Sequence, residues 1–500
     1  MSLAIVHSRA CVGMDAPPVT VEVHLSNGLP ALSIVGLPET AVKESKDRVR
    51  SAIINSQFDF PARRITINLA PADLPKEGGR FDLPIALGIL AASSQIPAIA
   101  LQHYEFAGEL ALSGELRSIQ GVLPMTLQTR KAQRTLIIPH GNLAEAQLVQ
   151  DAEVLAGNHL LMVTAHLSGA QRLVQETLTQ AVEQATTGPD LADVRGQHYA
   201  RRALEIAAAG GHNLIFSGPP GTGKSMLASR LPGILPEMSD AEALEAAAIV
   251  SVSGKPVDSC NWKRRAFRAP HHTASAAALV GGGSNPRPGE ISLAHQGVLF
   301  LDELPEFDRR VLEVLREPLE SGRIMISRAA RHTEFPARFQ LVAAMNPCPC
   351  GYLGDTSGRC HCNIDQLQRY RRKISGPLLD RIDMHVDVPR LSYADLEGST
   401  GEPSATVRAR VSAARNLQLQ RNHTLNSQLD NQQLGKYCRL EKPQQLLLQQ
   451  AMEHLQLSAR AYHRIIKLAR TIADLDCASL IETPHVSEAI NYRKLDRLLA

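Results

Sequence analysis

The sequence has no long apolar segment and very little net charge. No apolar run approaches the roughly 20 residues that a membrane-spanning helix needs. The first residues, Met1 to Val6, lack the basic start and long apolar stretch of a secretory signal. We therefore expect a cytoplasmic protein with no membrane partner. A formal charge of +3 over 500 residues gives no global sign of nucleic-acid binding, so any such site must be local.

Cysteine is scarce except in one place. Half of the eight cysteines stand alone: Cys11, Cys260, Cys438 and Cys477. The others form a tight cluster: Cys348, Cys350, Cys360 and Cys362. In a reducing compartment such a cluster indicates a metal site, here Zn²⁺ held by tetrahedral thiolates, more than disulfide bonds. The one-residue spacing in each pair is less usual than C-x-x-C, and four thiols without a metal are the alternative.

A glycine-rich loop follows a short apolar segment near the middle of the chain. Residues 214–216 predict a strand, and residues 218–225 fit the pattern G-x-x-x-x-G-K-[ST]. The loop consists of Gly218, Pro219, Pro220, Gly221, Thr222, Gly223, Lys224 and Ser225. Its glycines let backbone N–H groups fold around phosphates, and the following helix points its positive end at the same anion. In this pattern Lys224 binds the β and γ phosphates and Ser225 holds Mg²⁺.

A second apolar run ends in two carboxylates. Residues 298–301 predict a buried parallel strand, and Asp302 and Glu303 follow it directly. Asp302 fits a ligand in the Mg²⁺ shell, and Glu303 fits the base that polarises the attacking water. An acidic residue at the end of a core strand is common by chance. Its combination with a phosphate loop indicates an ATPase.

Basic residues gather on both sides of this acidic pair. A glycine-rich insertion before the pair carries Arg264, Arg265, Arg268 and Arg287. After the pair, residues 323–328 and 331–336 predict a β-hairpin with Arg328 and Arg331 at its tip. We interpret both segments as DNA-binding loops, with an ordinary solvated basic face as the alternative. The densest basic run, residues 369–373, faces either DNA or a neighbouring subunit in this interpretation.

The remaining sequence predicts four regions. Residues 1–165 mix strands at 20–25 and 64–69 with helices at about 39–54 and 83–92, and residues 166–192 form a polar linker. Residues 193–390 form the nucleotide core, in which a helix is expected from about 308 to 319 and a third strand, 339–345, ends at Asn346. Residues 391–500 predict helices at 407–421, 443–455, 459–475 and 483–494.

The first region resembles the proteolytic domain of Lon, an α+β fold of the ribosomal protein S5 domain 2 type. The resemblance rests on G-E-L-x-L-x-G-E-L at 108–116 and on residues 121–124 and 136–139. Lon uses a Ser–Lys dyad, whose positions fall near Phe81 and at Leu123 in this chain. Neither side chain can act as nucleophile or base. The resemblance therefore implies a Lon-like domain without peptidase activity, and an unrelated α/β domain is the alternative.

The later segments resemble AAA+ ATPases of the magnesium-chelatase-like branch. With the motifs above, N-P-C-P-C at 346–350 and I-S-G-P-L-L-D-R-I-D at 374–383 extend the resemblance over the whole chain to the ComM/YifB family of bacteria. It implies an α/β fold, with an AAA+ P-loop core and a helical lid. It also implies that Asn346 is sensor 1, that Arg381 is an arginine finger acting on a neighbour's ATP, and that Arg460 is sensor 2. Arg464, on the same helical face, competes for the last role.

The same resemblance implies an ATP- and Mg²⁺-dependent DNA helicase. Such a protein would form a homohexamer on single-stranded or branched DNA and promote branch migration in recombination during natural transformation. Two other classes share the ATPase core. A magnesium-chelatase subunit would have an ATPase indifferent to DNA, and a protein remodeller would have an ATPase stimulated by an unfolded protein such as casein.

Overall fold

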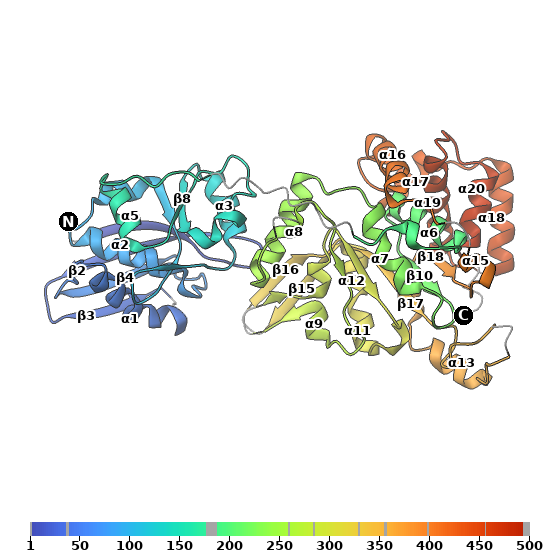
Figure 1. Ribbon diagram of the computed structural model, residues 1–500, viewed down its shortest axis with the longest axis horizontal. Coiled ribbons are helices and arrows are strands. Elements are labelled where there is room, and N and C mark those ends of the chain that lie inside the picture. Colours follow the sequence, from blue (N-terminus) through green and yellow to red (C-terminus); the bar gives the residue numbers. More distant parts are fainter. Residues whose placement is uncertain are drawn as a thin grey trace. The chain divides into compact units, whose positions relative to one another are not determined.

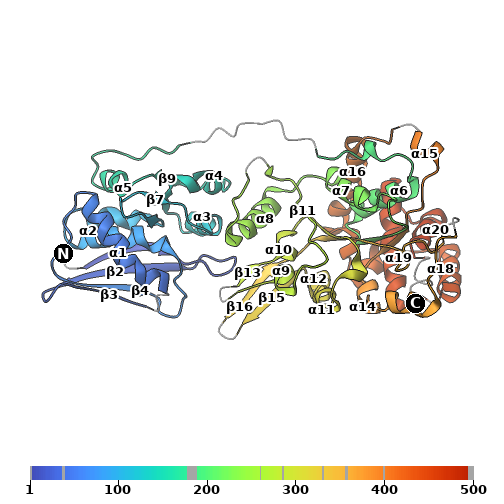
Figure 2. The same cartoon turned by 60° about the horizontal axis from the view of Figure 1, so that its bottom comes forward.

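A computed structural model describes residues 3–36, 40–176, 188–258, 261–283, 286–328, 331–354, 358–397, 400–455 and 457–493 (Figures 1 and 2). Its contacts divide the chain into two compact units. The first consists of Met1–Ala185, Ala243–Trp262 and Ser327–Phe335, and the second of Thr186–Glu242, Lys263–Ile326 and Pro336–Ala500. The domain boundaries expected from the sequence stay a prediction, and the predicted linker at 166–192 lies partly outside the described residues.

The first unit is built on a seven-stranded mixed sheet in the order β3-β4-β2-β1-β5-β8-β9. Its strands are β1 (Leu3–Arg9), β2 (Pro18–Ser26), β3 (Ala31–Val35), β4 (Arg64–Ala70), β5 (Tyr104–Phe106), β8 (Thr135–Pro139) and β9 (Val154–Gly157). β1, β2 and β4 pair antiparallel, whereas β5, β8 and β9 run parallel to their neighbours. Alternate residues of β2, such as Val21 and Val23, are buried, which is the period of two expected of a half-buried strand. The strands predicted at 20–25 and 64–69 are confirmed.

One face of this sheet is covered by a helix pair (Figure 2). α2 (Asp82–Ala92) lies against β1 and β2, and α1 (Thr40–Asn55) packs beside α2. Every residue of α2 is buried, as its uniformly apolar sequence requires. The carboxylate of Asp82 is the polar exception, and it accepts hydrogen bonds from Arg48 Nε at 2.8 Å and from the Leu110 amide at 3.2 Å. Both predicted helices are confirmed.

A second hydrophobic cluster of the first unit joins segments far apart in the sequence. Leu123 of α3 (Val122–Lys131), Leu148 and Val149 pack with Ala247 and Ala248 of α8 (Asp240–Ser253). The Leu123 amide also donates to the Ser251 hydroxyl at 3.4 Å. A segment that follows the glycine-rich loop in sequence thus completes the core of the first unit. The other elements here are β6 (Glu109–Leu110), β7 (Leu116–Arg117), α4 (Leu143–Ala146) and α5 (Leu160–Leu167).

The second unit is built on a five-stranded sheet in the order β11-β14-β17-β10-β18. Its strands are β10 (Leu214–Ser217), β11 (Phe267–Arg268), β14 (Val298–Leu301), β17 (Gln340–Met345) and β18 (Met384–Asp387). All neighbours pair in parallel, so every strand ends at the same edge. The three predicted core strands are confirmed, and the parallel sheet with helices is the α/β fold expected from the sequence.

Helices from both ends of the second unit cover this sheet. α6 (His198–Gly210) and α7 (Lys224–Ile234) pack against each other and against α16 (Ser404–Asn422), and α19 (Ala459–Leu475) packs on α6 (Figure 1). The predicted helical C-terminal region is confirmed by α16, α19 and three further helices: α17 (Asn431–Tyr437), α18 (Lys442–Leu455) and α20 (Thr483–Asn491). Within the described residues, no helix combines the length and the apolar character needed to cross a membrane.

The segment after β14 corrects one prediction. The single helix expected over residues 308–319 is two short helices, α11 (Arg309–Val314) and α12 (Arg316–Ser321). Pro318 has no N–H to donate to the carbonyl of Val314, so the helix breaks one turn before it. The predicted hairpin is confirmed as β15 (Arg323–Arg328) and β16 (Arg331–Pro336), of which Ser327–Phe335 is counted with the first unit and the rest with the second. Smaller elements of this unit are α9 (Ala276–Val280), β12 (Gly281–Gly282), β13 (Arg287–Pro288), α10 (Glu290–Leu293), η6 (Leu304–Glu306), α13 (Ile364–Arg371), α14 (Gly376–Leu379) and α15 (Tyr393–Glu397).

Candidate functional site

The glycine-rich loop connects the end of β10 to the start of α7. Gly221 and Gly223 have φ angles of 78° and 87°, a region that glycine enters at little cost. Gly218 is required for another reason, because an added Cβ would lie 2.2 Å from the carbonyl oxygen of Val388. The loop is therefore a tight turn with exposed backbone at the positive end of a helix, which is the geometry of an anion site.

Lys224 turns back over this loop. Its Nζ donates to the carbonyl oxygens of Gly218 and Pro219 at 2.7 and 2.8 Å and to Asn346 Oδ1 at 3.2 Å. Burial lowers the pKa of its ammonium, and the carboxylates of Asp302 and Glu303 oppose that shift. Lys224 is only 8% exposed, so its charge is directed at the loop and away from bulk water.

Ser225 and Asp302 meet beside the lysine. Ser225 Oγ donates to Asp302 Oδ2 at 2.6 Å, and Asp302 Oδ1 accepts the Glu303 amide at 2.9 Å. A hydroxyl and a carboxylate are the protein ligands that a nucleotide-bound Mg²⁺ takes in loops of this kind, while phosphate oxygens and water complete its shell. The donor set therefore fits Mg²⁺ with a nucleotide.

The parallel sheet explains why these residues converge. β17 lies between β14 and β10, with Ala343 opposite Leu301 and Met345 opposite Ser217. The residues that follow the three strands, Asp302, Asn346 and Gly218, therefore emerge at one edge. The structure brings together Lys224, Ser225, Asp302 and Asn346, all of which the sequence predicted for one site.

Glu303 lies next to this group and has a partner that the sequence analysis did not find. Its Oε2 is 3.2 Å from Nδ1 of His272. His271 and His272 are adjacent in the sequence, and adjacent histidines without a spaced partner are weak evidence of a metal site. The contact arises because β11 is the parallel neighbour of β14, and a strand of two residues gives no periodic signal in the sequence.

Arg381 lies apart from this group within its own chain. Its Nη1 donates to the Pro377 carbonyl at 2.6 Å, and its Nη2 pairs with the carboxylate of Glu320 in α12. The residue is buried, and its Nε has no partner among the described residues. A guanidinium held by an exposed carboxylate is compatible with a residue that acts on another subunit.

The two candidates for sensor 2 differ in their surroundings. Arg460 is 66% exposed and lies 3.8 Å from Asp380. Arg464 forms an ion pair with buried Asp383, which also accepts the Asn213 amide at 3.0 Å. Burial alone would raise the pKa of Asp383, but Arg464 and then His212 hold it well below its usual range. Arg464 is thus engaged in the fold, and Arg460 is the more exposed of the two side chains.

The arginines predicted to contact DNA divide into two groups. Arg265 donates to the carbonyls of Pro236 and Gln296 at 2.8 and 2.7 Å, and Arg268 forms a bidentate pair with Glu290 at 2.6 Å. Both are therefore occupied inside the unit. Arg264 and Arg287 are exposed. The side chains of Arg328 and Arg331 lie outside the described residues.

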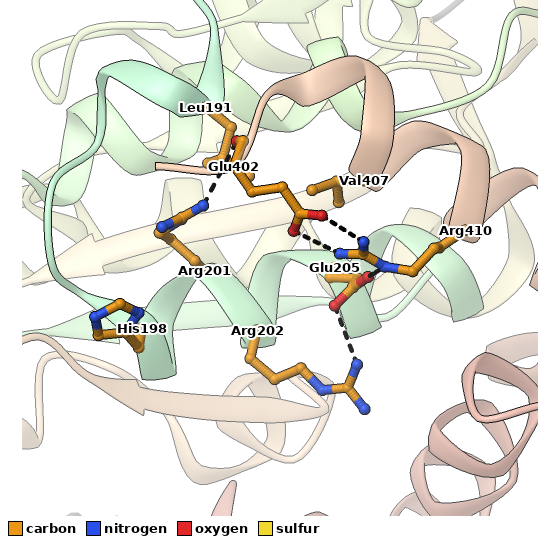
Figure 3. Close-up of a pocket in the computed structure, with 8 residues that line it drawn as sticks. All are labelled: Leu191, His198, Arg201, Arg202, Glu205, Glu402, Val407 and Arg410. Atoms are coloured by element: carbon orange, nitrogen blue, oxygen red, sulfur yellow. Dashed lines mark hydrogen bonds and ion pairs between the residues drawn. The ribbon is translucent and has the colours of Figure 1, made fainter. Parts of the chain in front are cut away.

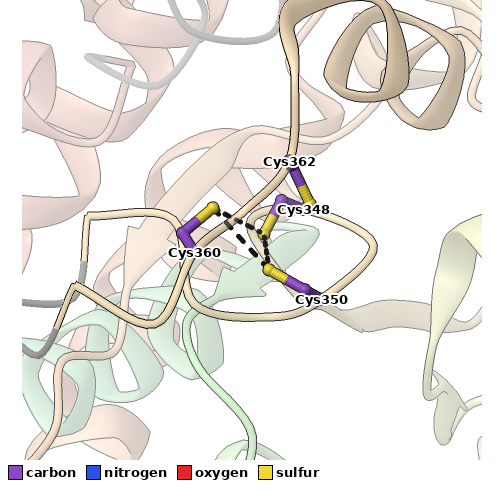
Figure 4. Close-up of side chains that lie close together, drawn as sticks. All are labelled: Cys348, Cys350, Cys360 and Cys362. Atoms are coloured by element: carbon purple, nitrogen blue, oxygen red, sulfur yellow. Dashed lines mark hydrogen bonds between the residues drawn. The ribbon is translucent and has the colours of Figure 1, made fainter.

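The cysteine cluster forms a compact group of sulfur atoms (Figure 4). The Sγ atom of Cys348 lies 3.3 Å from that of Cys350 and 3.8 Å from that of Cys360, and all four Sγ atoms, including that of Cys362, lie within 4.8 Å of one another. These separations suit a shared tetrahedral ion. Gly351 of this segment also packs closely against Pro220 of the phosphate loop. A Cβ added at Gly351 would lie only 2.8 Å from the Pro220 side chain.

A cavity of about 320 Å³ lies between α6 and α16 (Figure 3). It is lined by Leu191, His198, Arg201, Arg202, Glu205, Glu402, Val407 and Arg410. Arg410 bridges Glu205 and Glu402, with Nε and Nη1 each at 2.6 Å from a carboxylate oxygen. This pairing lowers the pKa of Glu402. The lining charges largely neutralise one another, and no predicted site residue is among them.

The positions of the expected Ser–Lys dyad are filled by core residues. Phe81 and Leu123 are both fully buried in hydrophobic clusters of the first unit. No nucleophile stands at either position, so these two residues provide no peptidase chemistry.

Family models match three parts of the chain. The model described as magnesium chelatase, subunit ChlI, matches residues 190–396. The model of subunit ChlI of Mg-chelatase matches residues 21–142, and the ChlI C-terminal model matches residues 401–493. Together they match parts of both units, and the matched ranges include all the predicted nucleotide-site residues.

Relatives extend over the whole length. Competence protein ComM of Haemophilus influenzae is 54% identical over 507 residues, which cover 100% of this chain and 99% of that protein. The uncharacterised protein YifB of Escherichia coli K12 is 52% identical over 501 residues, which cover 100% and 98%. DNA replication licensing factor Mcm2 of Drosophila melanogaster is 28% identical over 208 residues, which cover 38% of this chain and 20% of that protein. The family models and the MCM-type similarity indicate an ATPase, and the chain belongs to the ComM/YifB family of magnesium-chelatase-like AAA+ proteins.

Proposed function

We propose that this protein is an ATP-driven DNA motor, a hexameric helicase that promotes branch migration of recombining DNA during natural transformation in the cytoplasm. The observation that carries the proposal is the convergence of Lys224, Ser225, Asp302 and Asn346 at one edge of the parallel sheet. The competence name of a relative identical at 54% of positions and the similarity to Mcm2 favour DNA as the substrate.

Each converging residue has a separate task. The loop amides and Lys224 bind the phosphates, and Ser225 and Asp302 hold Mg²⁺. Asn346 orients the attacking water, and Glu303 accepts its proton. ATP hydrolysis supplies the free energy, which the helices after residue 391 convert into movement.

The position of Arg381 supports our proposal of a ring. Its guanidinium lies with Glu320 and Pro377 and away from the loop of its own chain. We assign it as the finger that stabilises the transition state on the adjacent subunit, and Arg460 as sensor 2. Such fingers supply about 10³–10⁵ in turnover, so an isolated subunit should hydrolyse ATP slowly. A homohexamer closes the ring.

DNA contacts are assigned to the exposed arginines. Arg264 and Arg287 of the insertion are exposed, and the hairpin β15–β16 carries Arg328 and Arg331 at its tip. Arg265 and Arg268 position the insertion through their internal partners. We assign residues 1–165 as a Lon-like accessory domain without peptidase activity.

We also propose Zn²⁺ as a structural ion of the cysteine cluster. The four sulfur atoms lie within 4.8 Å of one another on a segment that begins directly after Asn346. Bound there, the ion would hold this segment against Pro220, since Gly351 leaves no room for a side chain between them.

The test is the ATPase rate with and without single-stranded and forked DNA at low and moderate salt, with Lys224→Ala as the blank. We expect stimulation that weakens as salt rises, since log K falls by roughly 0.9 per phosphate neutralised on duplex DNA. Strand-displacement and branch-migration assays then measure the motor directly. A rate indifferent to DNA, or one stimulated by casein, would contradict the DNA motor and favour a chelatase-type or protein-remodelling ATPase.

A further inference from the structure

The cavity between α6 and α16 has a lining of mixed charge (Figure 3). Three arginines and two glutamates line it, so one positive charge is in excess. Leu191 and Val407 are buried and form its apolar part. None of the lining residues belongs to the proposed nucleotide site or to the proposed DNA-binding segments. The function proposed above therefore leaves the cavity without a role.

Both carboxylates of the cavity are already paired. Arg410 Nη1 and Nη2 donate to Glu402 at 2.6 and 2.8 Å, and Arg410 Nε donates to Glu205 at 2.6 Å. Arg202 Nη1 donates to the other oxygen of Glu205 at 3.0 Å, and Arg202 Nε donates to Glu488 at 3.1 Å. Two of the three arginines thus have carboxylate partners within the fold.

Arg201 is the arginine of the cavity that lacks such a partner. Within the described residues its guanidinium forms no ion pair, and Nη2 reaches the Glu402 carbonyl only at 3.5 Å, beyond the usual range of a hydrogen bond. Its Nε is buried and has no acceptor among the same residues. The guanidinium lies against Gly401, where an added Cβ would be 2.9 Å from Cζ. Because a guanidinium has five donors, Arg201 is left with donors for an anion from outside the chain.

The surroundings of Arg201 indicate which anion fits. His198 lies one turn earlier on the same side of α6, and both side chains line the cavity (Figure 3). Arginine binds carboxylates and phosphates through two parallel N–H groups, and a histidine ring N–H can donate to the same anion. Glu205 and Glu402 would repel a polyphosphate. The volume is at the lower end of the range for small-molecule pockets, about 300–1,000 Å³.

We propose that this cavity binds a small organic anion, whose single carboxylate or phosphate group is held by Arg201 and His198. The apolar body of the ligand contacts Leu191 and Val407. This site goes beyond the proposed function and does not rest on it, because it needs neither DNA nor ATP hydrolysis.

The ligand would contact two helices at once. α6 begins directly after Gln197, whose side-chain amide donates to the carbonyls of Pro389 at 2.8 Å and of Thr222, in the phosphate loop, at 3.4 Å. α16 belongs to the helical C-terminal region. The bound anion would therefore hold a helix of the nucleotide core to a helix of that region. Since it binds only the folded protein, the melting temperature should rise with its concentration.

The test is saturation-transfer NMR on the full-length protein with butyrate and propyl phosphate, two probes with the same tail and different head groups. Saturating Mg²⁺ and ADP keep the phosphate loop occupied. We expect the tail protons of at least one probe to receive saturation, which identifies the head group. In Arg201→Gln the Kd of that probe should rise by about tenfold or more, because hydrogen bonds to a charged group are lost. Arg201→Lys keeps the charge without the paired donors and should give an intermediate Kd.

Arg408→Gln is the matched control. Arg408 is an exposed arginine of α16 that donates to the Gly233 carbonyl at 2.8 Å and does not line the cavity. This variant should keep the wild-type Kd. Saturation of neither probe by the wild-type protein, or equal Kd values in wild type and Arg201→Gln, would overturn the inference. Absence of ATP hydrolysis or of DNA stimulation, with this binding intact, would contradict the proposed function alone.

Discussion

At the scale of single residues, Asp383 is a buried carboxylate with three partners. It pairs with Arg464 of α19, accepts the Asn213 amide at 3.0 Å and lies 3.6 Å from His212 Nδ1. Asp383 directly precedes β18, so the ion pair ties a C-terminal helix to the central sheet. Stability is therefore expected to depend on the partners of this one charge.

Arg464→Met should destabilise the second unit strongly. Removing one partner leaves an uncompensated buried charge, which costs about 3–5 kcal/mol of unfolding free energy. Chemical denaturation at pH 7 measures the change. Arg460→Met is the control, since an exposed pair at 3.8 Å contributes at most about 1 kcal/mol. Equal effects of the two substitutions would contradict the distinction between them.

The contribution of Asp383 should disappear in acid. Its pKa in the folded protein is held below the unfolded value of about 3.9, so its ionic stabilisation is fully present above that pH and is lost as the pH falls through the folded value. We expect Asp383→Asn to lower the melting temperature most above about pH 4 and progressively less below it. A penalty independent of pH would show that the charge is not what stabilises the fold.

Arg381→Ala separates nucleotide binding from hydrolysis. The side chain binds the Pro377 carbonyl and the Glu320 carboxylate, and within the described residues it forms no hydrogen bond or ion pair with the phosphate loop. ATP affinity should therefore stay near wild type while kcat falls by about 10³ or more. Binding of a fluorescent ATP analogue and steady-state hydrolysis measure the two quantities. Wild-type turnover in this variant would refute the assignment.

At the scale of elements, the cysteine segment should be a metal-dependent support for the phosphate loop. Protein purified without added zinc should contain one Zn²⁺ per chain, and Cys350→Ser with Cys360→Ser should lose it. Because Gly351 packs against Pro220, metal loss should raise the KM for ATP as well as lower the melting temperature. Cys477→Ser, at an exposed isolated cysteine, is the control. Full activity without stoichiometric zinc would end the hypothesis.

The elements most accurately predicted were those with a strong local signal. β10 and β14 are apolar runs, the first followed by the glycine-rich loop and the second by two carboxylates. α2 is apolar almost throughout. The break between α11 and α12 was missed because a single proline was outweighed by the surrounding helical pattern. The internal partners of Arg265 and Arg268 could not be predicted, since they depend on which distant carbonyls and carboxylates the fold brings near.

In the candidate site, too, residues with a local sequence pattern were predicted, and contacts that depend on the fold were not. Lys224, Ser225 and Asp302 belong to patterns whose spacing carries the chemistry, and the parallel sheet then aligns them with Asn346. The contact of His272 with Glu303 depends on the register of a strand of two residues, which is too short to be predicted from periodicity.

At the scale of the whole molecule, an arginine finger acting between subunits makes a complementation experiment decisive. Lys224→Ala and Arg381→Ala should each be inactive alone. In an equimolar mixture, random assembly gives about a quarter of the interfaces an intact Lys224 on one side and an intact Arg381 on the other. ATPase activity should return to about that fraction of wild type. No recovery in rings shown to contain both variants would place Arg381 in its own subunit's site.

Two segments from later in the sequence, Ala243–Trp262 and Ser327–Phe335, belong to the first unit. Their position affects the order in which the protein can fold during synthesis. Ala247 and Ala248 complete a cluster with Leu123, Leu148 and Val149, yet the ribosome adds them only after the entire phosphate loop. The main hydrophobic core of the first unit consists of residues between Ala4 and Leu167 and can form as the N-terminal region is synthesised, whereas this smaller cluster is completed only later. A fragment that stops before Ala243 would leave Leu123 and Leu148 uncovered. The hydrophobic contacts of the first unit are therefore complete only after part of the nucleotide-binding segment has been synthesised.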